Sequence, residues 1–204
     1  MPINYPNGRP FPHFHSNKPQ KKKEISYGNR GMSLESDLSH SNEYYRSRKI
    51  AVIHKKPTPV QIVKVNYPKR SAAKITEAYY QKASTTDYNG IYKGYYIDFE
   101  AKETRNKTSF PLKNFHDHQI EHLKDCHEQG GICFSILSFS RLNRIFVLDA
   151  EQLCYYWNNQ FEEKGAKSIP LAEIEKNAIE IHYGFAPRIP YLDAVDDMIH
   201  RRIK

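Results

Sequence analysis

Cysteine is scarce in this sequence: the 204 residues include three, Cys126, Cys133 and Cys154. Their number is odd and no Cys-x-x-Cys pair occurs, which argues against a disulfide framework and against a structural zinc motif. We expect free, buried thiols instead.

Long apolar runs are also missing. The run from Ile132 to Leu137 is one of the longest, and it stops well short of the roughly 18 residues that a membrane-spanning helix needs. The first residues contain no apolar segment of the kind found in a secretion signal. With 39% hydrophobic residues, including 15 Tyr and 10 Phe, the chain can still form a sizeable core. We therefore expect a soluble, cytoplasmic protein that has no membrane partner.

Acidic residues are absent from positions 1–23, which contain five basic residues and five prolines. This composition cannot form a core, so we predict a disordered basic tail over residues 1–23. A second basic block, residues 46–82, has ten basic residues and one acidic residue, whereas residues 83–204 have 15 basic and 18 acidic residues. The net charge of +8 is thus concentrated in two blocks attached to a mildly acidic body. This distribution favours a polyanionic partner, although blocks that serve only solubility are the alternative.

The order of apolar patterns and turn residues predicts an α/β fold with a mixed sheet flanked by helices. Residues 50–54 and 60–65 are β-branched runs separated by Pro57-Thr58-Pro59, and we interpret them as two strands joined by a turn. Residues 67–82 combine basic residues and tyrosines with few aliphatics, so we expect a projecting basic stalk there. Helices are expected at about 32–45, 117–128, 151–163 and 191–202, strands from 91 onward and at 131–139 and 144–149, and mainly loops between the last two helices.

Three charged residues alternate along one of these strands. Ile97, Phe99 and Ala101 are apolar, whereas Asp98, Glu100 and Lys102 between them are charged, which predicts one packed face and one chemical face. Asp87 precedes Glu100 by 13 positions, and Asn89-Gly90 lies between them. Because Asn-Gly is a strong turn signal, we predict a hairpin that folds Asp87 back beside Glu100.

Two carboxylates and an amine at one sheet end suit metal-assisted hydrolysis of a phosphodiester. Carboxylates are the hard oxygen ligands that Mg²⁺ prefers, and a lysine can orient the nucleophile or stabilise the transition state. The alternative is a solvated strand face on which Glu100 and Lys102 form an ordinary charge pair. Spacing alone does not separate the two interpretations.

A longer set of residues resembles a known family. The segments Thr85-Thr86-Asp87-Tyr88-Asn89-Gly90 and Asp98-Phe99-Glu100-Ala101-Lys102, with His116-Asp117-His118-Gln119 downstream and Asn29-Arg30-Gly31 and Glu35 upstream, resemble the RecU-type Holliday junction resolvases of bacteria. The resemblance extends from about Tyr27 to the C-terminus. It implies a restriction-endonuclease-like fold of the PD-(D/E)xK class, here a nuclease domain over residues 24–204 with the stalk at about 67–82. Thr86 replaces the proline of the broader motif, as it does in the resolvases.

The resemblance also implies a site and its partners. It places metal ligands at Thr85, Asp87, Glu100 and Gln119, with Asp87, Glu100 and Lys102 as the catalytic residues and Mg²⁺ or Mn²⁺ as the cofactor. It further implies a homodimer that cuts four-way junction DNA in the bacterial cytoplasm, at the nucleoid, and contacts with a RecA-type recombinase and a branch-migration helicase. We assign nucleic-acid contacts to six residues: Arg30, Lys56, Lys69, Arg70, Lys74 and Tyr80.

Two acidic residues and the histidines leave alternatives open. Asp98 shares the strand face of Glu100, and we favour a structural role for it, while Glu35 is a candidate for reaching the site through water. His118 and His122 form an i, i+4 pair that could bind zinc, but no HExxH motif is present. We expect these histidines to be exposed or to cap a helix.

The favoured function is a structure-selective endonuclease that resolves Holliday junctions by paired symmetric nicks during recombination and DNA repair. One alternative is a non-catalytic DNA-binding protein that modulates a recombinase. Another is a site-specific restriction endonuclease on the same fold, which would cut linear duplex at a short sequence.

Overall fold

The computed structural model describes residues 33–81 and 84–203. The chain divides into two units, Met1–Gly31 and Met32–Lys204, and the description concerns the second. The predicted tail at 1–23 and the predicted DNA contact Arg30 lie outside the described residues. None of the helices in the described ranges is long and apolar enough to cross a membrane.

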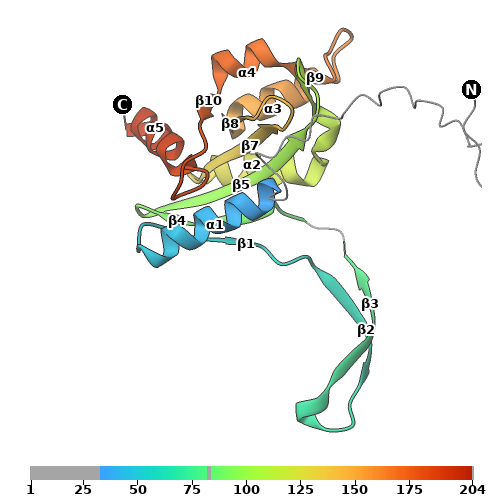
Figure 1. The fold of residues 1–204 in the computed structure, drawn as a ribbon. Coiled ribbons are helices and arrows are strands. Elements are labelled where there is room, and N and C mark those ends of the chain that lie inside the picture. Colours follow the sequence, from blue (N-terminus) through green and yellow to red (C-terminus); the bar gives the residue numbers. More distant parts are fainter. Residues whose placement is uncertain (1–32, 82–83, 204) are drawn as a thin grey trace, which may run out of the picture. The chain divides into compact units, whose positions relative to one another are not determined.

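A six-stranded mixed sheet forms the centre of this unit (Figure 1). Its strand order is β1-β4-β5-β7-β8-β10. The neighbours β5 and β7 are parallel, and the other four neighbouring pairs are antiparallel. The strands are β1 (Val52–Lys55), β4 (Tyr88–Tyr92), β5 (Tyr95–Thr104), β7 (Ile132–Phe139), β8 (Arg144–Asp149) and β10 (Ile179–Ile181).

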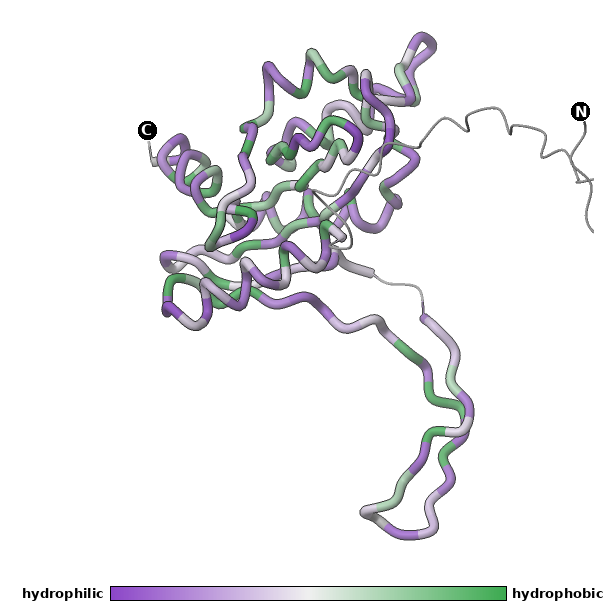
Figure 2. Tube along the Cα trace, viewed as in Figure 1, coloured by the Kyte–Doolittle hydropathy of each residue, from purple (hydrophilic) through white to green (hydrophobic). Residues whose placement is uncertain are grey.

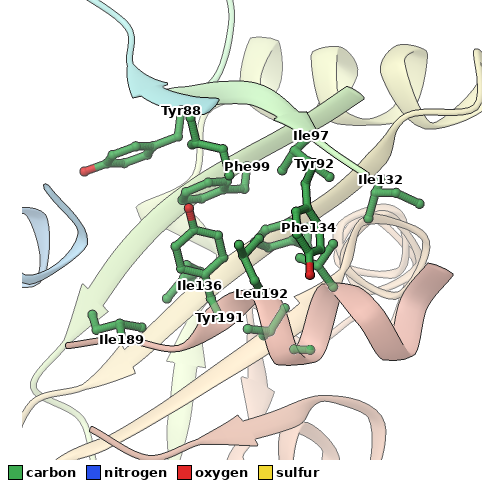
Figure 3. Packing of buried hydrophobic residues seen from close by; sticks show 14 of the residues in the cluster. Tyr88, Tyr92, Ile97, Phe99, Ile132, Phe134, Ile136, Ile189, Tyr191 and Leu192 are labelled. Atoms are coloured by element: carbon green, nitrogen blue, oxygen red, sulfur yellow. The ribbon is translucent and has the colours of Figure 1, made fainter. Parts of the chain in front are cut away.

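Helices cover both faces of the sheet because its central strands carry apolar side chains on both. One core cluster joins strand residues such as Phe99 and Phe134 to α1 (Leu34–Ser47) and α5 (Tyr191–Ile203). The Phe99 ring stacks on Tyr88 and on Phe134, with centroids 4.7 Å and 4.9 Å apart (Figure 3). The second cluster joins the opposite face to α2 (Asp117–Glu128), α3 (Ala150–Asn159) and α4 (Leu171–Asn177). The predicted α/β class, with helices around a mixed sheet, is confirmed.

The stretch expected to be loops contains short elements. β9 (Ser168–Pro170) pairs with β6 (Ser109–Pro111), and α4 and β10 follow it. Each has seven residues or fewer, too few for a periodic pattern to stand out.

The turn between β4 and β5 differs from the prediction. Asn89 and Gly90 lie inside β4, and the loop consists of Lys93 and Gly94, whose φ angles are 50° and 82°. Two positive φ values in a row are typical of a two-residue hairpin loop. Gly90 serves another purpose: a Cβ there would lie 2.0 Å from the Val52 carbonyl oxygen. The glycine therefore allows β1 to approach β4.

The predicted pairing of residues 50–54 with 60–65 is wrong. β1 pairs with β4, whereas β2 (Val60–Asn66) pairs with β3 (Lys74–Tyr80) in a separate two-stranded sheet. The two antiparallel pairings are therefore nested along the chain, with β1 and β4 at the base and β2 and β3 in the outer part. The Pro57-Thr58-Pro59 break lies between these two parts and is not a turn.

The outer part, residues 60–80, is here called the stalk hairpin. Every residue of β2 and β3 is exposed, and hydrophobic and hydrophilic positions are interspersed along it (Figure 2). The stalk predicted at about 67–82 corresponds to the tip and the returning strand of this hairpin, and β2 supplies the other strand.

Candidate active site

The pairing of β4 with β5 brings Asp87 to Glu100. Tyr88 is the register partner of Phe99, so the next position along each strand places Asp87 beside Glu100. The backbone N–H of Asp87 donates a hydrogen bond to Glu100 Oε2 at 3.1 Å. The predicted juxtaposition of these two residues is confirmed, although the turn that produces it is Lys93-Gly94.

Glu100 is a fully buried carboxylate whose hydrogen bonds are incomplete. Its side chain has no exposed surface, and Oε1 accepts no hydrogen bond although Lys102 Nζ lies 2.9 Å away. Burial raises the pKa of Glu100 to about 7; Lys102 opposes this shift, while the nearby Asp87 adds to it. A single ammonium does not offset the burial of this carboxylate beside a second one, because the pKa of Glu100 stays raised, and hard oxygen ligands of this kind suit a divalent cation. The residues therefore fit a divalent metal.

The predicted chemical face of β5 is buried and not solvated. Asp98 and Glu100 are both 0% exposed, and the Lys102 side chain keeps 19% of its surface accessible. Helix α2 contacts β5 and contributes to this cover. An ordinary surface charge pair, the alternative left open by the sequence, does not describe this arrangement.

A cavity of about 300 Å³ adjoins Asp87. Glu35 from α1 and Glu103 from β5 also line it. Glu35 Oε1 is paired with Lys55 Nζ at 2.5 Å, and burial together with Glu35, Asp87 and Glu100 raises the pKa of the Tyr88 hydroxyl. Glu35 thus shares a cavity with Asp87, and its action through water stays a prediction.

Thr85 and Gln119 are less closely connected to the two carboxylates. The Thr85 hydroxyl donates to the Thr86 carbonyl oxygen, and Gln119 Oε1 accepts from the His116 N–H at the start of α2. Within the described part of the chain, no hydrogen bond joins either residue to Asp87 or Glu100. Their assignment as metal ligands stays a prediction.

Asp98 has a network of its own, which the sequence did not indicate. One carboxylate oxygen accepts a hydrogen bond from the Thr86 hydroxyl. The other lies 2.9 Å from Lys56 Nζ, 2.7 Å from the Tyr96 hydroxyl and 3.2 Å from His122 Nε2. With its oxygens engaged in this way, Asp98 has little capacity left for a metal, which agrees with the structural role favoured from the sequence; that role stays a prediction. No spacing signal could have found the partners, because Lys56 and His122 are 42 and 24 positions away.

One of the two histidines considered for zinc, His122, belongs to a group of possible metal ligands among the described residues. Asp98, His122 and Cys126 have ligand atoms within 4.8 Å of one another, but Lys56 Nζ lies 3.5 Å from His122 Nε2 as well as close to Asp98. An ammonium group therefore already occupies the place of a cation. Neither this cluster nor the other one found among the described residues, His127 with Asp149 and Glu151, includes His118.

Comparisons with known proteins show the family to which this chain belongs. The model of the family "Recombination protein U" (RecU) matches residues 29–197. This chain belongs to the RecU family. A protein named "Holliday junction resolvase RecU" from Lactiplantibacillus plantarum is 58% identical over 201 residues, covering 98% of this chain and 97% of the relative. One of the same name from Geobacillus kaustophilus is 58% identical over 204 residues, covering 99% and 100%.

Among solved structures, the Holliday junction resolvase Hjc of Archaeoglobus fulgidus matches with a TM-score of 0.39 and 9% identity, covering 70% of this chain and 94% of that chain. The family model and the two relatives from the curated proteins confirm the resemblance to the RecU family that the sequence motifs indicated. Asp87, Glu100, Lys102 and Gln119 all lie within residues 29–197, which the family model matches.

The RecU-type DNA contacts predicted from the sequence fall into two groups. Lys69 and Lys74 are exposed, Tyr80 is 84% exposed, and Arg70 opens a short 3₁₀ turn at the tip of the stalk hairpin. Lys56 differs from these because its side chain is 19% exposed and its ammonium is bound by Asp98 and Thr86. Its role in DNA binding stays a prediction that this environment does not favour.

Proposed function

We propose that this protein is a divalent-metal-dependent endonuclease that resolves four-way DNA junctions by paired, symmetric nicks. The observation that carries the proposal is the buried Glu100 carboxylate, which lacks a hydrogen bond on Oε1 and lies beside Asp87 and Lys102. The close relatives named Holliday junction resolvase supply the substrate class. Recombination and repair of DNA in the bacterial cytoplasm are the processes in which such a substrate arises.

In this mechanism Asp87 and Glu100 would hold the metal, with Thr85 and Gln119 as its further predicted protein ligands. Bound Mg²⁺ or Mn²⁺ would lower the pKa of a water molecule and neutralise charge on the scissile phosphate. Lys102 keeps its ammonium 2.9 Å from Glu100 Oε1, where it orients the attacking water and stabilises the charge that develops on the phosphate. The oxygen of the attacking water bonds to phosphorus as one P–O bond of the DNA strand breaks; the water gives up its proton to solvent, and the leaving sugar oxygen takes one from solvent.

The stalk hairpin supplies selectivity for the junction. It carries four basic residues, Lys64, Lys69, Arg70 and Lys74, and one acidic residue, Glu77. The basic side chains would bind phosphates where the four arms meet, and Tyr80 would pack against an exposed base. Linear duplex has no such centre.

A homodimer matches the symmetry of the substrate. A four-way junction has approximate two-fold symmetry, and paired nicks in opposing strands require two identical sites related by that axis. Each protomer brings one site and one stalk hairpin. Contacts with a RecA-type recombinase and a branch-migration helicase would place the enzyme at junctions as they form.

The experiment uses a synthetic four-way junction and its separate linear duplex arms, with each strand labelled in turn, in the presence and absence of Mg²⁺. We expect metal-dependent nicks at symmetric positions in two opposing strands of the junction, and little cutting of the duplex. Cleavage of the duplex at one short sequence would favour a restriction endonuclease, and junction binding without cleavage would favour a non-catalytic modulator.

The matched variants for this experiment are Glu100→Gln and Glu128→Gln. The first removes an anionic ligand at nearly constant size, so cleavage should be lost while junction binding remains. The second makes the same change at an exposed residue of α2 that is paired with Lys124, and it should cut like the parent. Cleavage by Glu100→Gln at the parental rate would refute the proposed site.

A further inference from the structure

Lys56 binds the corner that carries Asp87 through both its main chain and its side chain. Its backbone N–H donates to the Asp87 carbonyl oxygen at 2.7 Å. Its Nζ donates to the Thr86 hydroxyl at 3.0 Å and forms an ion pair with Asp98 at 2.9 Å. Two hydrogen bonds from Lys56 therefore hold Thr86 and Asp87, and its ion pair ties the same ammonium to Asp98.

Asp98 provides the fixed point for these bonds. Its side chain is completely buried and it belongs to β5, the strand that also carries Glu100. The Thr86 hydroxyl donates to one of its oxygens and Lys56 Nζ to the other. Lys56 therefore connects the Asp87 corner to the strand that supplies the second predicted ligand.

Lys56 lies between the central sheet and the stalk hairpin in the chain. Lys56 directly follows β1, and the stalk hairpin begins four residues later at Val60 (Figure 1). The base of that hairpin is closed by a hydrogen bond from the Gln81 N–H to the Pro59 carbonyl oxygen. The chain then continues to Thr85, Thr86 and Asp87. The two segments that lead out of the stalk hairpin are thus held to each other at Lys56 and Asp87.

The engaged ammonium argues against a direct phosphate contact. A buried charge that loses its partner is strongly destabilised, so moving Lys56 Nζ from Asp98 to a phosphate would leave Asp98 with one cationic partner fewer. Lys69 and Lys74 are exposed and would bind phosphate without such a loss.

We propose that Lys56 is a positioning residue that holds the Thr86–Asp87 corner against Asp98, so that the Asp87 carboxylate is correctly placed to bind the divalent metal. The proposal rests on the proposed metal-dependent function. Lys56 does not touch the reacting atoms and acts through Asp87. It contributes to metal affinity and not to the affinity for DNA.

The test compares Lys56→Met with Lys93→Met. Methionine keeps most of the length of the lysine side chain and removes its charge and its hydrogen bonds. Lys93 lies in the β4–β5 turn and its ammonium is paired with Asp196 of α5, so the control removes one lysine ion pair at the end of β4 that is remote from Asp87. Mn²⁺ binding without DNA is measured by electron paramagnetic resonance, junction binding in Ca²⁺ by gel shift, and cleavage as a function of Mg²⁺ concentration.

We expect Lys56→Met to weaken Mn²⁺ binding about tenfold, which corresponds to about 1.4 kcal/mol, and to shift the Mg²⁺ midpoint of cleavage by a similar factor. Junction affinity and its salt dependence should remain those of the parent, and Lys93→Met should be unchanged in all three measurements. If Lys56→Met instead weakens junction binding, lowers the salt slope and leaves Mn²⁺ binding intact, Lys56 is a phosphate contact and the proposal is overturned.

A double variant keeps the test valid if Lys56→Met does not fold. Lys56→Met/Asp98→Asn removes both charges together, so that no buried charge is left alone, and circular dichroism checks its fold. We expect the double variant to fold and still bind Mn²⁺ weakly, because the corner has lost its ammonium donor. Metal affinity restored to the parental value would show that Lys56 merely neutralises Asp98, and would overturn the proposal.

Measurements on the parent protein distinguish failure of the proposed function from failure of the proposed role of Lys56. A parent that neither binds Mn²⁺ nor cleaves the junction would refute the proposed function together with the role of Lys56. A parent that does both, alongside a Lys56→Met variant that binds Mn²⁺ equally well, would refute the role of Lys56 alone.

Discussion

The backbone N–H of Asp87 donates a hydrogen bond to a side-chain oxygen of Glu100, 13 positions further along the chain, at 3.1 Å. One predicted metal ligand is thereby held by the main chain of the other. The other Glu100 oxygen accepts no hydrogen bond and lies beside Lys102. Burial makes the ionised form of Glu100 unfavourable even with the Lys102 ammonium beside it, and this makes the site testable by stability as well as by activity.

The first prediction concerns stability in the absence of metal. The folded-state pKa of Glu100 is raised from 4.5 to about 7, so the folded protein binds more protons than the unfolded chain between these pH values. The contribution of Glu100 to the free energy of unfolding is therefore most favourable below about pH 4.5 and falls by up to about 3 kcal/mol as the pH rises to 7. Urea denaturation in EDTA at pH 5 and pH 8 measures this decrease.

Two variants and the addition of Mg²⁺ serve as controls for the urea denaturation measurement. Glu100→Gln should abolish the fall in the free energy of unfolding that Glu100 causes between pH 5 and pH 8, and should therefore be more stable than the parent at pH 8. Glu128→Gln, at an exposed position, should show the same fall as the parent. Mg²⁺ added to the parent at pH 8 should raise its stability, because a ligand that binds only the folded state stabilises it. A parental stability that does not change between pH 5 and pH 8 would contradict the proposed environment of Glu100.

The second prediction concerns Lys102. Its ammonium is next to Glu100, and its side chain is partly exposed, as a group that meets water and phosphate must be. Lys102→Ala should lower the cleavage rate at saturating Mg²⁺ at least about 100-fold, or roughly 3 kcal/mol of transition-state stabilisation. Single-turnover cleavage of the junction measures this rate. The same change at exposed Lys113 is the control, and a loss below about tenfold at Lys102 would identify it as an ordinary surface lysine.

The third prediction concerns Gly90, where β1 approaches β4. A Cβ at this position would lie 2.0 Å from the Val52 carbonyl oxygen, so Gly90→Ala must separate the two strands. We expect a loss of about 3 kcal/mol or more in the free energy of unfolding. Gly94→Ala is the matched comparison: its Cβ meets open space, but its φ of 82° predicts a loss of about 1–2 kcal/mol. Equal losses at the two glycines would show that β1 moves away freely.

The sequence predicted those parts of the site that depend on local patterns. Alternation identified β5, the pattern of residues identified α2 from Asp117 to Glu128, and the expected hairpin brought Asp87 next to Glu100, although its turn was assigned to the wrong residues. Strand pairing was harder to predict. Asn89-Gly90 resembles a turn, but Gly90 is required by its contact with β1, and that contact joins residues 38 positions apart. Local sequence contains no information about such a contact.

The network of Asp98 was unpredictable for the same reason. Lys56, Thr86, Tyr96 and His122 come from four separate segments, and they meet because the sheet register and the packing of α2 bring them together. An alternating charged strand shows which side chains share a face. It does not show which of two carboxylates will find partners for its oxygens and which will lack one.

The last prediction concerns the stalk hairpin. The Gln81 N–H is bound to the Pro59 carbonyl oxygen, so residues 60–80 can be replaced by a short Gly-Ser linker between two ends that are already in contact. Because every residue of β2 and β3 is exposed, the deletion removes no core, and the variant should fold and form the same oligomer as the parent. It also removes four basic residues and three exposed tyrosines, Tyr67, Tyr79 and Tyr80.

Junction binding by this deletion variant should fall much more than binding to linear duplex, and junction cleavage should fall with it, while Mn²⁺ binding without DNA stays unchanged. A milder variant, Lys69→Gln/Lys74→Gln, should weaken junction binding mainly through its salt-dependent part, with a slope reduced by about two. Tyr80→Ala should weaken it with little change in that slope, since stacking involves no counterion release. An equal loss on both DNA substrates would mean that selectivity for the junction arises in another part of the protein, because the duplex also presents phosphates but has no open centre for the hairpin to enter.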